Sequence, residues 1–282
     1  MIFKKYQAAQ YLMIIISLLI WSQMSLYILH EFGGYSPTWG ILQYCLSALA
    51  ESTILHLVIF IGLNLMILYS FVLIIIKLYQ QIKLERQWNT QIQFQCDYSL
   101  TKRLCEKYEF TEGRIIVVHH DSFLAVTSGF LRPKIVVSSK LVRDFTEQEV
   151  TAVILHEYAH TKRYDPLRLL IIHLIKGSLP FVPIFKKFSY YIEVWMEIEA
   201  DQYAINQMKS PYDLASVLYK CTQSKQKRVV GVGFADKAIN YRIQKLLHPK
   251  SDIIIPVLEI KPLAMSSILF VLLNVVIISS CS

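Results

Sequence analysis

The stretch His156-Glu157-Tyr158-Ala159-His160 says more about fold and chemistry than any other part of this sequence. Two histidines four residues apart lie on the same face of a helix, so their imidazoles can bind one metal ion together. Glu157 lies between them, where its carboxylate can take a proton from an attacking water. The pattern therefore predicts a hydrolytic zinc site built on a helix.

The residues before this stretch predict where its helix begins. Thr146 is a candidate N-cap, and Glu149 follows it at the spacing of a capping box. Apolar side chains then recur at helical spacing, at Val150, Val153, Ile154 and Tyr158. The alternative to a metal site is an amphipathic helix whose two histidines are simply solvated.

A hydrolytic zinc site needs a third protein ligand, and the best candidates lie farther along the chain. Residues 191–204 read as a helix on which Glu193, Glu197 and Asp201 lie one turn apart on one face. Like charges stacked in this way repel unless a cation lies among them, so we expect Glu197 to be the third ligand. Asp201 is then placed to accept a hydrogen bond from a ligating histidine and fix its tautomer. Glu199 points about 160° away from Asp201, and we expect it to be solvated.

Together these motifs resemble those of the BlaR/MecR family of membrane zinc peptidases. The resemblance is carried by residues 156–160, by Glu197-Ile198-Glu199-Ala200-Asp201, by residues 131–138 and by Asp165. The second motif also resembles, more distantly, that of the Ste24/HtpX peptidases. The resemblance covers about residues 85–250. It implies that His156, His160 and Glu197 bind Zn²⁺, that Glu157 is the general base, and that Asp201 supports a ligand. The β-lactam sensor domain of the best-known members is not expected in this chain.

Composition predicts a membrane protein with a sizeable polar domain. Hydrophobic residues make up 54% of the chain and the mean hydropathy is +0.39, above the usual range for a soluble enzyme. Three apolar stretches reach or approach the length of a bilayer span, at about residues 8–29, 53–76 and 263–278. We therefore expect three regions: a membrane region at 1–83, a zinc metallopeptidase domain at 84–260, and a C-terminal transmembrane helix at 261–282.

Basic residues predict which side of the membrane the peptidase domain faces. They flank the apolar stretches at Lys4, Lys5, Lys77, Lys83, Arg86 and Lys261, whereas residues 30–52 contain no Lys or Arg. By the positive-inside rule the peptidase domain faces the cytoplasm of a multi-pass cell-membrane protein. The net charge of +8 fits attraction to anionic lipid headgroups, and no nucleic-acid partner is expected.

Between the membrane region and the zinc helix, three short segments predict a small sheet. Residues 114–118, 123–127 and 134–138 are rich in β-branched and aromatic side chains. The predicted fold class is thus α+β: a mainly helical, gluzincin-like zinc peptidase domain with a small β-sheet, anchored by transmembrane helices. An exposed edge of this sheet can hold a substrate as an extra strand.

Three further histidines and two further segments lie outside the predicted metal site. His119 and His120 are expected in a turn, and His173 is not expected to be a ligand. Residues 166–185 predict a helix in the domain core or at the membrane interface, although the segment contains two prolines, and the alternative is a segment that dips into the membrane. Residues 36–50 are too short for a separate span and are expected to be re-entrant or extracytoplasmic.

Arg242 has two interpretations. It resembles an arginine in an Arg-Ile element of the Ste24/HtpX peptidases, where a cation can stabilise the oxyanion of the tetrahedral intermediate. The simpler interpretation is a basic residue on an amphipathic helix.

The function predicted from the resemblance is a membrane zinc metalloendopeptidase in signal transduction. Its expected partners are the lipid bilayer and a protein substrate, which is a cytoplasmic or membrane-proximal protein such as a transcriptional repressor, or the chain itself. Two alternatives stay open: a receptor with the same fold and negligible turnover, and a quality-control protease of the Ste24/HtpX type. The oligomeric state is left open.

Overall fold

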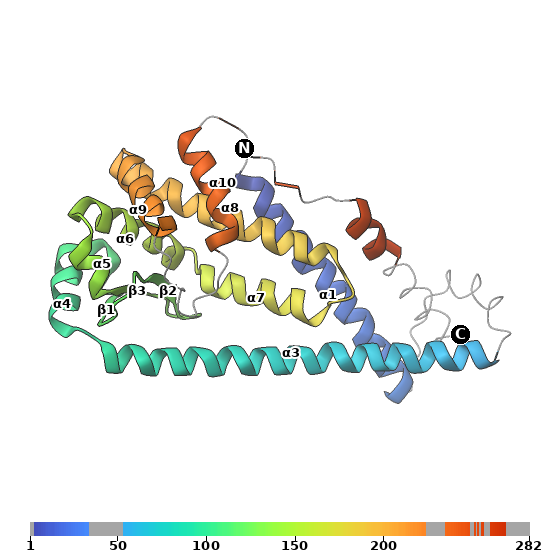
Figure 1. Ribbon diagram of the computed structural model, residues 1–282. Coiled ribbons are helices and arrows are strands. Elements are labelled where there is room, and N and C mark those ends of the chain that lie inside the picture. The colour runs from blue at the N-terminus through green and yellow to red at the C-terminus, as the bar shows by residue number, and fades with distance from the viewer. Residues whose placement is uncertain are drawn as a thin grey trace. The chain divides into compact units, whose positions relative to one another are not determined.

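The computed structural model describes residues 3–33, 53–223, 235–248, 251, 253, 255–256 and 260–268. They divide into two compact units (Figure 1). The helical unit groups Met1–Tyr79, Ile172–Ser189 and Pro256–Ser282, and the sheet unit groups Gln80–Ile171 and Tyr190–Ile255. Residues 36–50 and most of the predicted C-terminal transmembrane helix lie outside the described residues, although 260–268 are helical.

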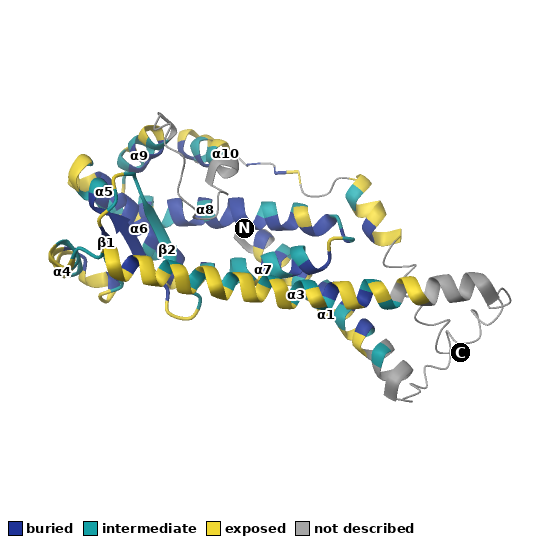
Figure 2. Ribbon diagram, turned by 60° about the horizontal axis from the view of Figure 1, so that its bottom comes forward, coloured by how far each residue is buried: buried dark blue, intermediate teal, exposed yellow. Residues whose placement is uncertain are grey.

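The helical unit contains the two apolar helices. These are α1 (Phe3–Gly33) and the first part of α3 (Thr53–Gln95). Within the described residues, Tyr6–Ser25 and Asn64–Gln95 are long and apolar enough to cross a membrane, judged by length and composition. Both helices expose apolar side chains, including Ile15, Leu18, Leu68 and Ile75, and exposed bands run along α3 in Figure 2. Contiguous apolar surface of this kind needs a partner or lipid to cover it.

One helix predicted from the sequence is two helices in the structure. Residues 166–185 were expected to form a single helix, but α7 (Asp165–Ser178) ends before Pro180, and α8 (Ile184–Met208) begins after Pro183. Proline has no backbone N–H and cannot continue a helix, so the two prolines account for the break. The carbonyl of Ser178, at the end of α7, accepts a hydrogen bond of 2.9 Å from the buried Ser70 hydroxyl.

The sheet unit contains the predicted small sheet, which the structure confirms. Its strands are β1 (Ile115–Val118), β2 (Ala125–Ser128) and β3 (Lys134–Ser138). Their order is β1-β3-β2, with β1 parallel and β2 antiparallel to β3, so β2 lies at an edge.

The two faces of the sheet pack against different helices because side chains alternate along a strand. One face enters a core with α4 (Tyr98–Lys107), α5 (Ser139–Asp144) and α6 (Glu147–Lys162), through Ile115, Val117, Ile135 and Val137. The other face packs Val118 and Val136 against Ile92 near the end of α3. This arrangement fixes α6 against the sheet.

Helix α6 begins where the sequence predicts. The Thr146 side chain accepts from the Glu149 backbone and the Glu149 carboxylate accepts from the Thr146 backbone, which is a complete capping box. Ser216 and Lys220 of α9 (Tyr212–Gln223) also donate to Glu149. Burial alone would raise the pKa of Glu149, but the bonds from Lys220, Ser216 and Thr146 lower it to about 2. The start of α6 is therefore anchored on both its own turn and α9.

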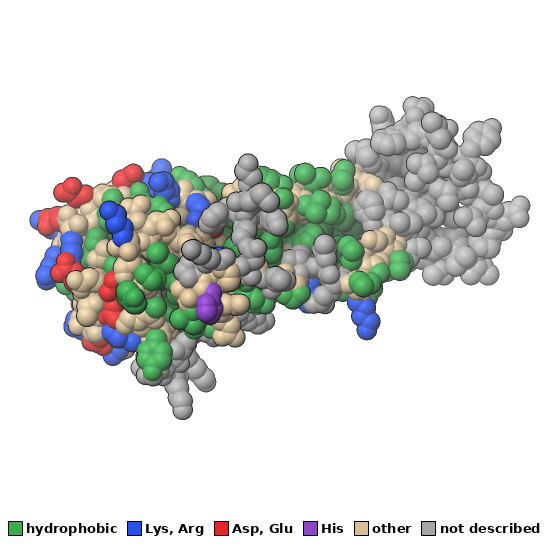
Figure 3. Space-filling model, turned by 90° about the horizontal axis from the view of Figure 1, so that it is seen from above, with side chains coloured by type: hydrophobic (Ala, Val, Ile, Leu, Met, Phe, Trp, Pro, Cys, Tyr) green, Lys and Arg blue, Asp and Glu red, His purple; other side chains and the backbone are tan. Residues whose placement is uncertain are grey.

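The surface of the sheet unit is strongly charged. In Figure 3, acidic and basic side chains are interspersed over the face of the sheet unit that is turned to the viewer. Mixed charge of this kind suits contact with water.

Candidate metal centre

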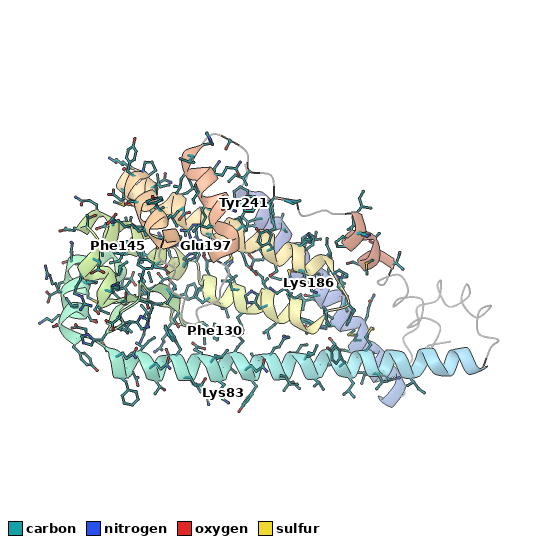
Figure 4. All side chains as sticks on the ribbon, in the orientation of Figure 1. Lys83, Phe130, Phe145, Lys186, Glu197 and Tyr241 are labelled. Carbon is teal, nitrogen blue, oxygen red and sulfur yellow. The ribbon has the colours of Figure 1, made fainter. Side chains whose placement is uncertain are left out.

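Helices α6 and α8 bring three potential metal ligands together. His156 and His160 lie one turn apart on α6, and their Nε2 atoms are 3.2 Å apart. Glu197 comes from α8, with Oε2 3.5 Å from Nε2 of His156 and Oε1 3.6 Å from Nε2 of His160. Figure 4 labels Glu197 beneath α10 (Ala235–Leu247). Among the residues that the structure describes, this is the group of His, Cys, Asp and Glu that could hold a metal ion.

The separations between these atoms fit a small tetrahedral ion. Zinc binds nitrogen and oxygen at about 2.0–2.2 Å, which places two ligand atoms of a tetrahedron about 3.3–3.6 Å apart. The nitrogen–nitrogen distance of 3.2 Å is close to this range, and each oxygen of the Glu197 carboxylate lies 3.5 or 3.6 Å from one of the two nitrogens. Two imidazoles and a carboxylate are also a common donor set for catalytic zinc. The residues therefore fit the ion that the motif predicts.

Behind His160 lies an aspartate from the same part of the chain. Nδ1 of His160 lies 2.8 Å from Oδ2 of Asp165, the first residue of α7. Arg163 and Arg168 also donate to this carboxylate, at 3.3 and 2.7 Å. Burial raises the pKa of Asp165, but the bond to His160 and the two arginine charges hold it below its usual value. A carboxylate here fixes the ring so that Nε2 points toward the other ligands.

Behind His156 lies an aspartate from a distant helix. Nδ1 of His156 lies 2.9 Å from Oδ1 of Asp201, the residue predicted from the sequence to support one of the ligating histidines. The contact is short but poorly aligned for a hydrogen bond, and Nδ1 is otherwise buried without a partner among the described residues. Asp201 in turn accepts two bonds from Arg242 of α10, from Nε at 2.8 Å and from Nη2 at 2.7 Å.

The carboxylates at the site stay ionised, as metal ligands and their supports must. Burial raises the pKa values of Glu197 and Asp201, but the Arg242 guanidinium and His156 hold both well below their usual range. Burial and Arg242 both disfavour a proton on His156, yet Asp201 and Glu197 outweigh them and raise its pKa to about 9. Both carboxylates are therefore anionic at neutral pH, and protons compete with a metal for His156.

Glu157 lies beside the ligands with its side chain held in place. The side chain is buried, and the Thr127 hydroxyl on β2 donates to its Oε2 at 2.8 Å. The same hydroxyl lies 2.9 Å from the backbone carbonyl of Glu157. The edge strand thus orients the carboxylate that the sequence predicts as the general base.

Arg242 is a basic residue on the helix α10, as in the simpler interpretation, but its side chain is buried at the metal centre. It is only 7% exposed, and its Nη1 donates to Oε2 of Glu197 at 2.9 Å. With its bonds to Asp201, the guanidinium neutralises two of the three acidic residues stacked on α8. The sequence predicts a cation among these acidic residues, and the Arg242 guanidinium supplies part of that positive charge. Its suggested contact with an oxyanion stays a prediction.

Glu199 is buried and not solvated, which corrects the expectation from the sequence. Its carboxylate lies 3.2 Å from Nη1 of Arg163. The expectation failed because α8 is buried on several sides, so a position opposite Asp201 does not face water. His119 and His120 lie in the turn after β1, where the His120 ring accepts from the Ser122 backbone at 3.1 Å.

Sequence reasoning missed the parts played by Asp165, Thr127 and Arg163. Asp165 counted only as a point of resemblance, although its spacing from His160 places it in the next turn of chain. Thr127 was assigned to a strand without a role. A single sequence carries no signal that pairs a strand threonine with Glu157, which lies 30 residues away.

Two histidines with a glutamate between them, and a second glutamate from another helix, form the arrangement expected of a metallopeptidase site. The family model described as BlaR1 peptidase M56 matches residues 43–246, well over half of the chain, and the chain belongs to this family. The match confirms the resemblance to BlaR/MecR peptidases, which are metallopeptidases. Among curated proteins, no sequence matches the chain.

Proposed function

We propose that this protein is a membrane zinc metalloendopeptidase that cleaves a cytoplasmic or membrane-proximal protein, as a step in signal transduction. The observation that carries the proposal is the convergence of His156, His160 and Glu197 at ligand-to-ligand distances that suit zinc, with the buried Glu157 beside them. His156, His160 and Glu197 would hold the ion. When bound, zinc supplies Lewis acidity and lowers the pKa of water toward about 7.

The protein's own residues would handle the proton. Glu157 takes a proton from the attacking water and passes it to the leaving amine, with Thr127 holding one carboxylate oxygen in place. Asp165 and Asp201 keep the two imidazoles oriented. Arg242 donates to Oε2 of Glu197, so the other carboxylate oxygen would be the one available to hold the ion.

The edge of the sheet supports the choice of an extended peptide as substrate. Ser138 donates its backbone N–H to the carbonyl of Leu124 at the start of the β2–β3 pairing. Because such bonds alternate along an antiparallel pair, the backbone groups of Ala125 and Thr127 face away from β3. A peptide added there as a strand would run directly beside Glu157.

The membrane part of the proposal rests on α1 and α3 and on the basic residues near their ends. Two apolar helices and membership of a membrane peptidase family suggest association with a bilayer. The excess of Lys and Arg on one side of the spans favours a multi-pass protein with its peptidase domain in the cytoplasm. A transcriptional repressor, or this chain itself, is the substrate that the family suggests.

Replacement of the proposed base tests this function. In Glu157→Gln, we expect zinc to stay bound, measured by metal analysis of the purified chain. Self-processing, or cleavage of an unfolded reporter protein in nanodiscs, should fall by about 10²–10⁴-fold. Glu106→Gln is a matched control, since Glu106 is exposed on α4 and forms a surface pair with Lys102.

Two outcomes would favour the alternatives. Undiminished output from Glu157→Gln with zinc still bound would identify a receptor without turnover. Comparable cleavage of many unrelated misfolded membrane proteins would identify a quality-control protease.

A further inference from the structure

Arg163, the residue directly after α6, reaches three groups around the metal centre. Its Nε lies 3.3 Å from Oδ2 of Asp165, and its Nη1 lies 3.2 Å from Glu199 on α8. Its Nη2 donates to the backbone carbonyl of Met196 at 3.5 Å. The Arg163 side chain thus contacts the carboxylate that supports His160. It also contacts Met196, directly before Glu197, and Glu199, two residues after it.

We propose that Arg163 is a positioning residue, which ties the end of α6 to α8 so that ligands from the two helices stay in register. The inference rests on the proposed metal site and concerns what holds that site together. Arg163 acts through Asp165 on His160, and through Met196 and Glu199 on Glu197.

On the α6 side, Arg163 completes the fixation of Asp165. Oδ2 of this aspartate is shared between His160 Nδ1 and Arg163 Nε, while Oδ1 accepts from Arg168 at 2.7 Å. Both oxygens are therefore held, and the carboxylate cannot rotate away from the imidazole without breaking a bond to an arginine. Loss of Arg163 frees the oxygen that faces His160.

The contacts of Arg163 and Asp165 stabilise an unusual backbone conformation in the turn between α6 and α7. Tyr164, between Arg163 and Asp165, has a φ of 54°, a left-handed conformation that side chains other than glycine rarely adopt. Such a residue costs about 1 kcal/mol and persists where surrounding contacts determine it. The left-handed residue reverses the chain and returns Asp165 toward the helix that carries His160.

Arg163 also contacts α8 close to Glu197, the third ligand. Met196 precedes Glu197 and Glu199 follows it by two residues. Each residue advances a helix by about 1.5 Å, so contacts on both sides of Glu197 resist sliding or rotation of α8 at this point. Metal ligands must lie within about 0.5 Å of their required positions, so contacts that fix α8 relative to α6 help to keep the site intact.

The test measures metal binding by the full chain in nanodiscs, with zinc titrated against a competing chelator. In Arg163→Gln we expect zinc affinity to fall about 10-fold or more, as when other supports of ligands are removed. The Co²⁺ absorption spectrum should also broaden, because the ligands become less ordered. Arg163→Lys should restore part of the affinity, since an ammonium can satisfy one of the contacts but lacks the planar fork.

A double variant separates positioning from stability. Arg163→Gln leaves Glu199 without this partner, and Arg163→Gln combined with Glu199→Gln removes that charge as well. We expect the double variant to regain thermal stability but not zinc affinity, because the link to Asp165 is still missing. Arg103→Gln, at an exposed position of α4, is the matched control and should keep wild-type affinity.

Wild-type zinc affinity in Arg163→Gln would overturn the inference, as would recovery of zinc affinity in the double variant. If the wild-type chain itself binds no zinc, the proposed function fails first. The two failures are therefore distinguishable in one set of titrations.

Discussion

The two histidines of the metal centre are supported in the same way by different parts of the molecule. Each has an aspartate behind Nδ1, and each aspartate is held by arginine. For His160 the whole support lies within the next eight residues, in the turn and first turn of α7. For His156 it comes from Asp201 on α8 and Arg242 on α10.

One histidine of the site is therefore oriented by residues close to it in sequence, and the other by residues from distant helices. The support of His160 can form as soon as the turn after α6 forms, and its hydrogen bond to Asp165 is well aligned. The support of His156 exists only when α8 and α10 are packed, and the contact with Asp201 is less well aligned. We therefore expect substitutions on the long-range side to cost more stability.

The largest expected effect is the loss of Arg242. Arg242→Gln leaves the buried Asp201 and the partly exposed Glu197 without their shared counter-charge, which we expect to lower the free energy of unfolding by about 3–5 kcal/mol. Arg168→Gln is the matched variant on the local side and should lower it by about 1 kcal/mol, because Asp165 keeps Arg163 and His160. Unfolding of the metal-free chain in detergent measures both, and equal losses would contradict the comparison.

Zinc affinity should respond to both sides, with a smaller effect. Asp165→Asn and Asp201→Asn should each weaken zinc binding by about 10–100-fold, since each removes the anion that orients one imidazole. In addition, Asp201→Asn should lower stability, because Arg242 then has Glu197 as its remaining carboxylate partner at the site. Chelator competition and thermal unfolding provide the two readouts. Unchanged affinity in either variant would show that its aspartate does not position a ligand.

The smallest expected effect on stability concerns Glu149, at the start of α6. Its carboxylate accepts hydrogen bonds from Thr146 in its own turn and from Ser216 and Lys220 on α9. The pKa of Glu149 is lowered from 4.5 to about 2, so its contribution is fully present above pH 4.5 and is lost as the pH falls through about 2. With Lys220 partly exposed, we expect this contribution to be about 1–2 kcal/mol. The stability difference between wild type and Glu149→Gln should therefore shrink below pH 4.5, and a constant difference would contradict the assignment.

Features that depend on neighbours in sequence were predictable. The capping box at Thr146 and Glu149 and the shared face of His156 and His160 follow from helical spacing alone. The three strands fall within two residues of their predicted bounds because their alternating side chains pack on both sides. A contact between Asp201 and a ligating histidine was predicted from chemistry, and the structure shows that this histidine is His156.

Features that depend on packing between distant segments were not predictable. Glu199 is buried because α8 has neighbours on several sides, and helical spacing by itself does not say how many faces are covered. The two hydrogen bonds from the Arg242 guanidinium to Asp201 require α10 to pack against α8, and no pattern within α10 indicates this packing. The hydroxyl of Thr127 meets Glu157 because β2 is the strand beside α6.

By itself, the sequence determined the motif helix, the candidate ligands and the family, because these depend on residue types at fixed spacing along one helix. The tertiary structure decided which charges are paired: Arg242 with Asp201 and Glu197, and Arg163 with Asp165 and Glu199. The physical reason is that burying a charge is costly unless an opposite charge is within reach. Whether one is within reach depends on which helices pack together, and the order of residues along one helix does not reveal this.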